Sequence, residues 1–127
     1  MKILVVEDQP TDLKLAVEVL RAAGHQVDHA DAAPRARAAI ERQRPDVILM
    51  DLSLPETDGL AIARDLKADP ATRAIHIVAI TSYPDDFSRS EALAAGCDAY
   101  LAKPVDTRAL PGILTGVVES ARRIPEP

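Results

Sequence analysis

Short apolar runs alternate along the chain with segments in which apolar residues recur at helical spacing. Three runs, residues 3–6, 47–50 and 77–80, are almost wholly aliphatic. Two weaker runs, 26–30 and 99–102, complete a set of five, and the polar character of 26–30 is typical of an edge strand. Near-continuous apolar strands are typical of parallel sheets that are covered on both faces.

Each apolar run is followed by a segment with helical periodicity. In the first of these segments the apolar residues are spaced i, i+3, i+4, i+7, and they are Leu13, Ala16, Val17 and Leu20. Gly24 and Gly96 are predicted to end two of the helices, because glycine is favoured just after a helix. The five strand–helix units predict an α/β domain with helices on both faces of one parallel sheet.

The last helix is predicted to start irregularly. Pro111, Gly112 and Gly116 all lower its helix propensity. If Asp106 caps this helix, Pro111 lies inside it and removes a hydrogen bond. We therefore expect the helix to begin near Pro111, after an irregular first turn.

Composition narrows the class of protein. A chain of 127 residues suits one domain, which we expect to span residues 1–122 and to be followed by a short tail, 123–127. The net charge of −5 disfavours direct nucleic-acid binding, and no apolar stretch is long enough to span a membrane. The single Cys97, expected to be a buried small hydrophobe, and the lack of a signal peptide favour a cytoplasmic setting.

Polar residues stand at or just past the carboxyl ends of four predicted strands. They are Glu7, Asp8, Asp51, Thr81 and Lys103. In open α/β sheets this edge is where ligands bind. We therefore expect the five side chains to converge, although they are far apart in the sequence.

The three carboxylates among them predict a metal site. At a separation of ~4 Å and an effective dielectric near 20, two carboxylates repel each other by about 4 kcal/mol. Such a cluster needs a proton or a cation, and Mg²⁺, with Mn²⁺ as a possible substitute, suits carboxylate and carbonyl oxygens. One acid at a strand end is usually a solvated loop residue. The group of Glu7, Asp8 and Asp51 is what indicates a site.

The remaining polar residues indicate phosphoryl transfer to Asp51. A carboxylate can attack phosphorus and form an aspartyl phosphate. Lys103 can neutralise charge on the phosphoryl oxygens, and Thr81 can donate a hydrogen bond to one of them. No residue is assigned to an organic cofactor.

Four segments together resemble the response-regulator receiver domain of two-component signalling, over essentially the whole chain. They are Val5-Val6-Glu7-Asp8, residues 48–55 with Asp58-Gly59, Ile80-Thr81-Ser82, and residues 99–104. The resemblance is to stand-alone regulators of the cell-cycle type. It implies a flavodoxin-like, doubly wound five-stranded sheet with strand order 2-1-3-4-5. It also implies a phosphorylation switch and not a conventional enzyme, although the domain catalyses its own phosphorylation and dephosphorylation.

The resemblance also implies ligands and partners. Mg²⁺ is expected on Asp8, Asp51 and the backbone carbonyl of Ser53, with Glu7 acting partly through water, and the Lys103–Pro104 peptide bond is expected to be cis. The phosphoryl donor is expected to be a sensor histidine kinase or a histidine phosphotransfer protein.

Two tyrosines extend these expectations. Tyr100 matches the switch aromatic of the family, so a downstream protein is expected to bind the face that contains it. The protein is expected to be a monomer or a weak dimer that depends on phosphorylation. Tyr83, a bulky residue two positions after Thr81, is hypothesised to shield the aspartyl phosphate from water and to lengthen its lifetime.

Three other classes of function fit the sequence less well. A phosphohydrolase or phosphotransferase with an aspartate nucleophile commonly has a second acid two residues later, where this chain has Ser53. A flavin- or nucleotide-binding domain would need a glycine-rich first turn, but residues 7–12 are acidic and lack glycine. A receiver that is not phosphorylated conflicts with the complete set of pocket residues. The arginines around the second helix are interpreted as a solvated helix face.

Overall fold

The five predicted strands form one parallel sheet in the computed structural model, which describes residues 1–54 and 58–122. The strands are β1 (Lys2–Val6), β2 (Gln26–Ala30), β3 (Val47–Asp51), β4 (His76–Thr81) and β5 (Ala99–Ala102). Their order is β2-β1-β3-β4-β5, which confirms the predicted doubly wound topology and the edge position of β2. The expected tail, 123–127, lies outside the described residues.

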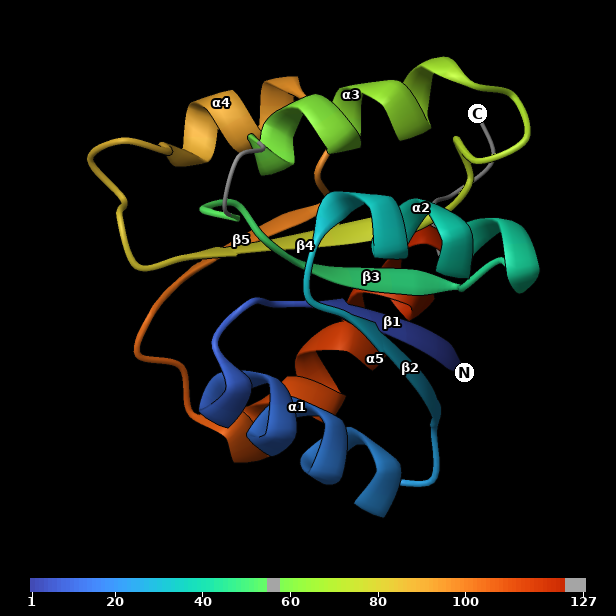
Figure 1. The fold of residues 1–127 in the computed structure, drawn as a ribbon, viewed down its shortest axis with the longest axis vertical. Coiled ribbons are helices and arrows are strands. Elements are labelled where there is room, and N and C mark those ends of the chain that lie inside the picture. Colours follow the sequence, from blue (N-terminus) through green and yellow to red (C-terminus); the bar gives the residue numbers. More distant parts are fainter. Residues whose placement is uncertain (55–57, 123–127) are drawn as a thin grey trace.

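Helices cover both faces of the sheet, as predicted (Figure 1). The helices are α1 (Pro10–Ala22), α2 (Ala33–Arg42), α3 (Gly59–Ala68), α4 (Arg89–Ala94) and α5 (Leu110–Arg122). Helices α1 and α5 lie on one face, and α2, α3 and α4 lie on the other. Among the described residues, no helix is long and apolar enough to cross a membrane.

Two aliphatic cores result from the alternation of side chains along the central strands. Because successive side chains of a strand point to opposite faces, each strand contributes to both cores. Ile3, Val5, Leu49 and Val78 pack with α1 and α5. Leu4, Val6, Met50 and Ile77 pack with α2, α3 and α4.

The strand order creates a crevice at the carboxyl edge of the sheet between β1 and β3. These strands are neighbours, with Val6 paired to Met50. The chain leaves β1 toward α1 on one face and leaves β3 toward α3 on the other. Such a reversal of winding is the usual ligand position in an open α/β sheet. The fold therefore places the residues after Val6 beside Asp51.

The last helix starts as the sequence predicts. Asp106 caps a short 3₁₀ helix, η1 (Thr107–Ala109), by accepting a hydrogen bond from the backbone N–H of Arg108. Helix α5 then begins at Leu110, so Pro111 falls in its first turn, where a missing N–H costs little. The peptide bond between Lys103 and Pro104 is cis, as expected.

Of the four arginines around α2, Arg35, Arg37 and Arg42 form ion pairs on the surface, and Arg44 donates to the carbonyl of Ala71. Arg37 pairs with Asp65 at 2.8 Å, and Arg42 pairs with Asp28 at 2.7 Å. All four side chains are exposed, and such pairs contribute little stability. A solvated helix face accounts for this cluster.

Gly59, the first residue of α3, packs against the strand that carries Asp51. A Cβ atom at this position would lie 2.8 Å from Leu52 Cα and 2.9 Å from the backbone oxygen of Asp51. Both contacts are to backbone, so relief would require the start of α3 to move away from β3. By contrast, a Cβ atom at Gly116 would meet no atom within 4 Å.

We predict opposite effects of alanine at these two glycines. Gly59→Ala should lower the free energy of unfolding by about 1–3 kcal/mol, because the added methyl group overpacks the α3–β3 contact. Gly116→Ala should raise it by about 0.5–1 kcal/mol, because alanine is the better helix former in the open interior of α5. Urea denaturation followed by circular dichroism measures both. Equal stabilities of the two variants would contradict the packing assigned to Gly59.

Candidate functional site

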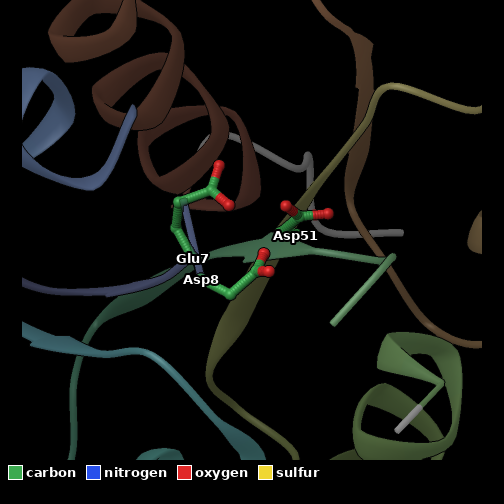
Figure 2. Close-up of side chains that lie close together, drawn as sticks. All are labelled: Glu7, Asp8 and Asp51. Atoms are coloured by element: carbon green, nitrogen blue, oxygen red, sulfur yellow. The ribbon is translucent and has the colours of Figure 1, made fainter. Parts of the chain in front are cut away.

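Three acidic residues gather at the carboxyl ends of β1 and β3 (Figure 2). Glu7 and Asp51 are almost wholly buried, at 5% and 2% exposure, and Asp8 is partly buried. One carboxylate oxygen from each of the three residues lies within 4.8 Å of the other two. The predicted convergence of the acids is therefore present in the structure.

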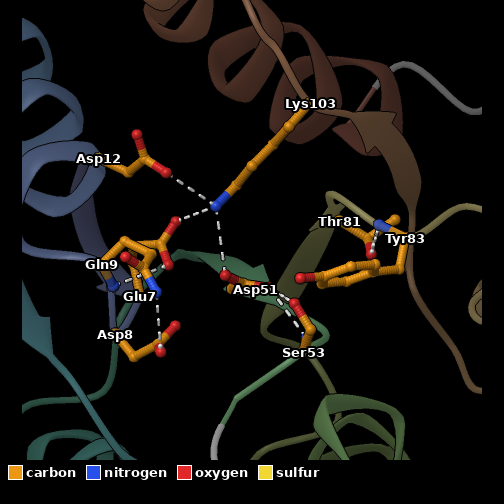
Figure 3. Close-up of polar contacts among 9 residues, drawn as sticks. All are labelled: Glu7, Asp8, Gln9, Asp12, Asp51, Ser53, Thr81, Tyr83 and Lys103. Atoms are coloured by element: carbon orange, nitrogen blue, oxygen red, sulfur yellow. Dashed lines mark hydrogen bonds and ion pairs between the residues drawn. The ribbon is translucent and has the colours of Figure 1, made fainter.

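Lys103 brings a positive charge into this acidic cluster (Figure 3). Its ammonium group contacts the carboxylates of Glu7, of Asp12 at 3.1 Å and of Asp51 at 3.3 Å. Its backbone N–H donates to the carbonyl of Thr81 at 2.8 Å, which fixes the start of the side chain at the end of β4. The lysine therefore links the ends of three strands and the first turn of α1.

Asp51 lies among hydrogen-bond donors that favour its ionised form. The backbone N–H and the hydroxyl of Ser53 both donate to Oδ1 of Asp51, at 2.9 and 2.8 Å. Burial alone would raise the pKa of Asp51. The hydrogen bonds from Glu7 and Ser53 and the charge of Lys103 outweigh burial and hold this pKa below its ordinary value. Asp51 is therefore an ionised carboxylate at neutral pH, as a nucleophile must be.

Glu7 and Lys103 are shifted in ways that follow from the same contacts. Burial, and then the neighbouring carboxyl group of Asp51, raise the pKa of Glu7 to about 7, although the bond from Lys103 opposes this. For Lys103, burial lowers the pKa, but the hydrogen bond to Glu7 and the charge of Asp51 more than offset this, so the pKa is raised. Lys103 is thus a lasting positive charge in the pocket, and the carboxyl groups around it outnumber it.

The donor set fits a hard divalent cation. Three carboxylates within 4.8 Å offer only oxygen atoms, and they lie at the surface end of the crevice, where Asp8 is partly exposed to water. Mg²⁺ is commonly held by one or two carboxylates while it keeps several water molecules. The group is therefore chemically suited to Mg²⁺, as the sequence predicted.

Thr81 is buried at the end of β4, and its hydroxyl group is engaged within the following loop. The backbone N–H of Tyr83 donates to Oγ1 of Thr81 at 2.9 Å. In the described part of the chain, no hydrogen bond joins Thr81 to Asp51. Thr81 thus lies at the same sheet edge as Asp51, with its hydroxyl group bonded to the loop instead.

Tyr100 is joined to the segment between β4 and α4. Its hydroxyl group donates to the backbone oxygen of Phe87. The guanidinium of Arg89 lies 5.5 Å from the centre of the Tyr100 ring and donates to the Tyr100 carbonyl at 3.4 Å. The position of this ring therefore depends on the conformation of the loop that follows Thr81.

Two contacts made by the groups around Asp51 and Lys103 show what the sequence does not predict. One is the bond between Asp12 and Lys103, and the other is the hydroxyl bond from Ser53 to Asp51. Asp12 belongs to the first turn of the helix after β1. An acid at this position is the sequence signal by which a fourth carboxylate at this edge could have been found. The hydroxyl of Ser53 had no such signal, because a serine in a loop has many possible partners.

Comparison with known proteins identifies the class. The family model of the response regulator receiver domain matches residues 3–115. The chain therefore belongs to the response regulator receiver family of two-component signalling. Members of this family are signalling switches and not conventional enzymes, and they bind Mg²⁺ at an acidic pocket.

Individual relatives support this assignment. The chain is 32% identical over 103 residues to the polar-differentiation response regulator DivK of Brucella anthropi, and the match covers 81% of the chain and 84% of DivK. It is 38% identical over 105 residues to the response regulator PleD of Caulobacter vibrioides. That match covers 83% of the chain, but the chain spans only 23% of the length of PleD.

Solved structures agree with the fold and include a metal-bound example. The receiver domain of a sensor histidine kinase from Pseudomonas aeruginosa is 36% identical, with a TM-score of 0.82 and coverage of 93% of this chain and 97% of that one. Its crystal structure holds a magnesium ion in the active-site cleft. A receiver domain from Methanospirillum hungatei gives a TM-score of 0.87 at 25% identity, with 96% of each chain covered.

We predict that Asp8→Asn weakens Mg²⁺ binding about tenfold or more, because it removes one of three converging carboxylates. Isothermal titration calorimetry is the suitable measurement, since the chain has no tryptophan to report binding by fluorescence. Asp31→Asn is the matched control, because it removes an equal charge from an exposed aspartate that pairs with Arg35. Equal Mg²⁺ affinities of the two variants would contradict a metal site at Asp8.

Proposed function

We propose that this chain is a phosphorylation switch in which Asp51 accepts a phosphoryl group from a phosphohistidine. The observation that carries the proposal is the environment of Asp51. It is a buried, ionised carboxylate that contacts a protonated lysine and lies beside two further acids. This arrangement combines a nucleophile with the charge neutralisation that phosphoryl transfer requires.

The transfer step follows from these groups. A carboxylate oxygen of Asp51 attacks phosphorus, the phosphorus–nitrogen bond to the donor histidine breaks, and its electron pair stays on the imidazole nitrogen. Lys103 stabilises charge on an equatorial phosphoryl oxygen. Mg²⁺, held by Asp8, Asp51 and the backbone carbonyl of Ser53 with Glu7 partly through water, would neutralise the remaining charge. The later attack of water on phosphorus restores Asp51 and releases phosphate.

A chain of hydrogen bonds provides a route from the phosphoryl group to the surface. Phosphorylation raises the charge at Asp51 from −1 to about −2. Thr81 would move toward this group and donate its hydroxyl to a phosphoryl oxygen, which disturbs the bond from the N–H of Tyr83. The carbonyl of Tyr83 accepts from the N–H of Phe87, whose own carbonyl binds Tyr100. Movement of Thr81 is thereby transmitted to Tyr100.

Two kinds of partner are expected, one that supplies the phosphoryl group and one that binds the altered surface. The donor is a sensor histidine kinase or a histidine phosphotransfer protein, and a downstream protein binds the face that contains Tyr100. The net charge of −5 argues against nucleic acid as that partner. The protein acts in the cytoplasm as a monomer or as a weak dimer that depends on phosphorylation. Residues 1–122 form the receiver domain, which agrees with the family match over residues 3–115.

We predict that the purified protein, incubated with Mg²⁺ and acetyl phosphate, gains the mass of one phosphoryl group. The aspartyl phosphate forms because Asp51 is ionised and Lys103 neutralises the incoming charge. Intact-protein mass spectrometry measures the gain. It should be absent in Asp51→Asn and after removal of Mg²⁺ by a chelator. An unmodified wild-type protein, or equal modification of Asp51→Asn, would count against the proposed function.

We also predict that Tyr83→Ala shortens the lifetime of the aspartyl phosphate about threefold or more, because a bulky ring excludes water from the pocket. Tyr83 is 56% exposed, and Figure 3 shows its ring directed toward Asp51 and Ser53. The measurement is the loss of phosphoryl mass over time. Leu93→Ala, which truncates a similarly exposed side chain on α4, should leave the lifetime unchanged. If Tyr83→Ala and wild type lose phosphate at one rate, the shielding role is wrong.

A further inference from the structure

Asp12 contacts the ammonium group of Lys103 from the side of α1. Its carboxylate lies 3.1 Å from Nζ of Lys103, slightly closer than that of Asp51 at 3.3 Å. Figure 3 shows the ammonium between the two carboxylates, with Asp12 approaching from the first turn of α1 and Asp51 from the end of β3. Asp12 is outside the group of three acids suited to the metal.

The ammonium group has no spare donor in this arrangement. A protonated lysine has three N–H groups. Nζ of Lys103 makes three contacts, one each with Glu7, Asp12 and Asp51. A phosphoryl oxygen that binds Lys103 must therefore replace or share one of these carboxylates.

Burial determines which of the three carboxylates loses its contact with Lys103 at the lowest cost. The side chains of Glu7 and Asp51 are 6% and 3% exposed, so loss of Lys103 would leave a buried charge without its partner, which is costly. The side chain of Asp12 is 49% exposed. Water can replace Lys103 at such a site, and exposed ion pairs contribute little stability. Asp12 is thus the partner that Lys103 loses at the lowest cost.

We infer that Asp12 is a positioning residue that holds Lys103 on the α1 side of the pocket before phosphorylation and competes with the phosphoryl group for the ammonium. This inference rests on the proposed phosphorylation of Asp51. If so, Asp12 slows the phosphorylation of Asp51. Both the bond to Lys103 and the negative charge of Asp12 disfavour an incoming phosphate dianion.

Ions in solution should weaken this restraint. A groove of about 390 Å³ lies beside the pocket, and Asp12, Lys103, Glu7 and Pro104 all line it. Solvent ions therefore reach the pair of Asp12 and Lys103. At an ionic strength near 1 M the screening length falls to roughly 3 Å, against roughly 30 Å at 0.01 M. A charge effect of Asp12 should accordingly be large at low ionic strength and small at high ionic strength.

The test compares rates of Asp51 phosphorylation by acetyl phosphate, at a Mg²⁺ concentration that saturates each variant. Asp12→Asn should react about three- to tenfold faster than wild type at low ionic strength. The difference should shrink as potassium chloride is added. Asp12→Glu, which keeps the charge, should restore most of the restraint. Asp65→Asn is the matched control: it removes an equal charge and an ion pair, with Arg37, on α3. It should match wild type.

The outcomes separate this inference from the proposed function. If wild-type protein gains no phosphoryl group, the proposed function itself fails. If wild type is phosphorylated and Asp12→Asn reacts at the same rate or more slowly, Asp12 does not restrain the reaction and the inference is overturned. The inference is also overturned if the higher phosphorylation rate of Asp12→Asn does not change with ionic strength. The same holds if Asp65→Asn shows an equal increase in rate.

Discussion

The contact of one lysine with several carboxylates is the interaction on which this pocket depends. Glu7 and Asp51 are buried within hydrogen-bonding distance of the same ammonium group. Two buried carboxylates without a cation would repel each other strongly in a medium of low dielectric. Lys103 offsets that repulsion without a bound metal, and its own pKa is raised in consequence. The pocket can therefore exist before Mg²⁺ or a phosphoryl donor arrives.

The fold makes this contact possible through strand order. Glu7 and Lys103 are separated by 96 positions in the chain, and they meet because parallel strands end at one edge of the sheet. The backbone bond from Lys103 to Thr81 ties the lysine to the end of β4. Gly59 allows α3 to approach the strand that carries Asp51. Backbone contacts next to the pocket thus set the geometry of the charged groups.

Much of this arrangement could be predicted from the sequence, because it follows from hydrophobic pattern and position. The apolar runs located all five strands, and the polar residues at the ends of four of them located Glu7, Asp51, Thr81 and Lys103 at one edge. The partners of individual side chains could not be predicted. The bond from Thr81 to the N–H of Tyr83 depends on the path of a loop. The bond between Asp12 and Lys103 depends on where a long, flexible side chain ends.

Charge imbalance explains why phosphorylation of this pocket should change its surroundings. Glu7, Asp8, Asp12 and Asp51 supply four carboxyl groups, against the single ammonium of Lys103. Burial and the neighbouring carboxyl group of Asp51 raise the pKa of Glu7 to about 7, which is the direction that this excess of negative charge favours.

In the proposed reaction a divalent cation would compensate most of the excess, and phosphorylation of Asp51 would then add about one negative charge. Among the described residues, two donors that would answer that charge are engaged elsewhere. The ammonium of Lys103 is shared with Asp12, and the hydroxyl of Thr81 is held by the loop at Tyr83. Redirecting Lys103 away from α1 would break only its contact with the exposed carboxylate of Asp12. In the proposed switch, redirecting Thr81 would move the loop that binds Tyr100, so the same shortage of positive charge would both restrain the reaction and transmit its result to the surface.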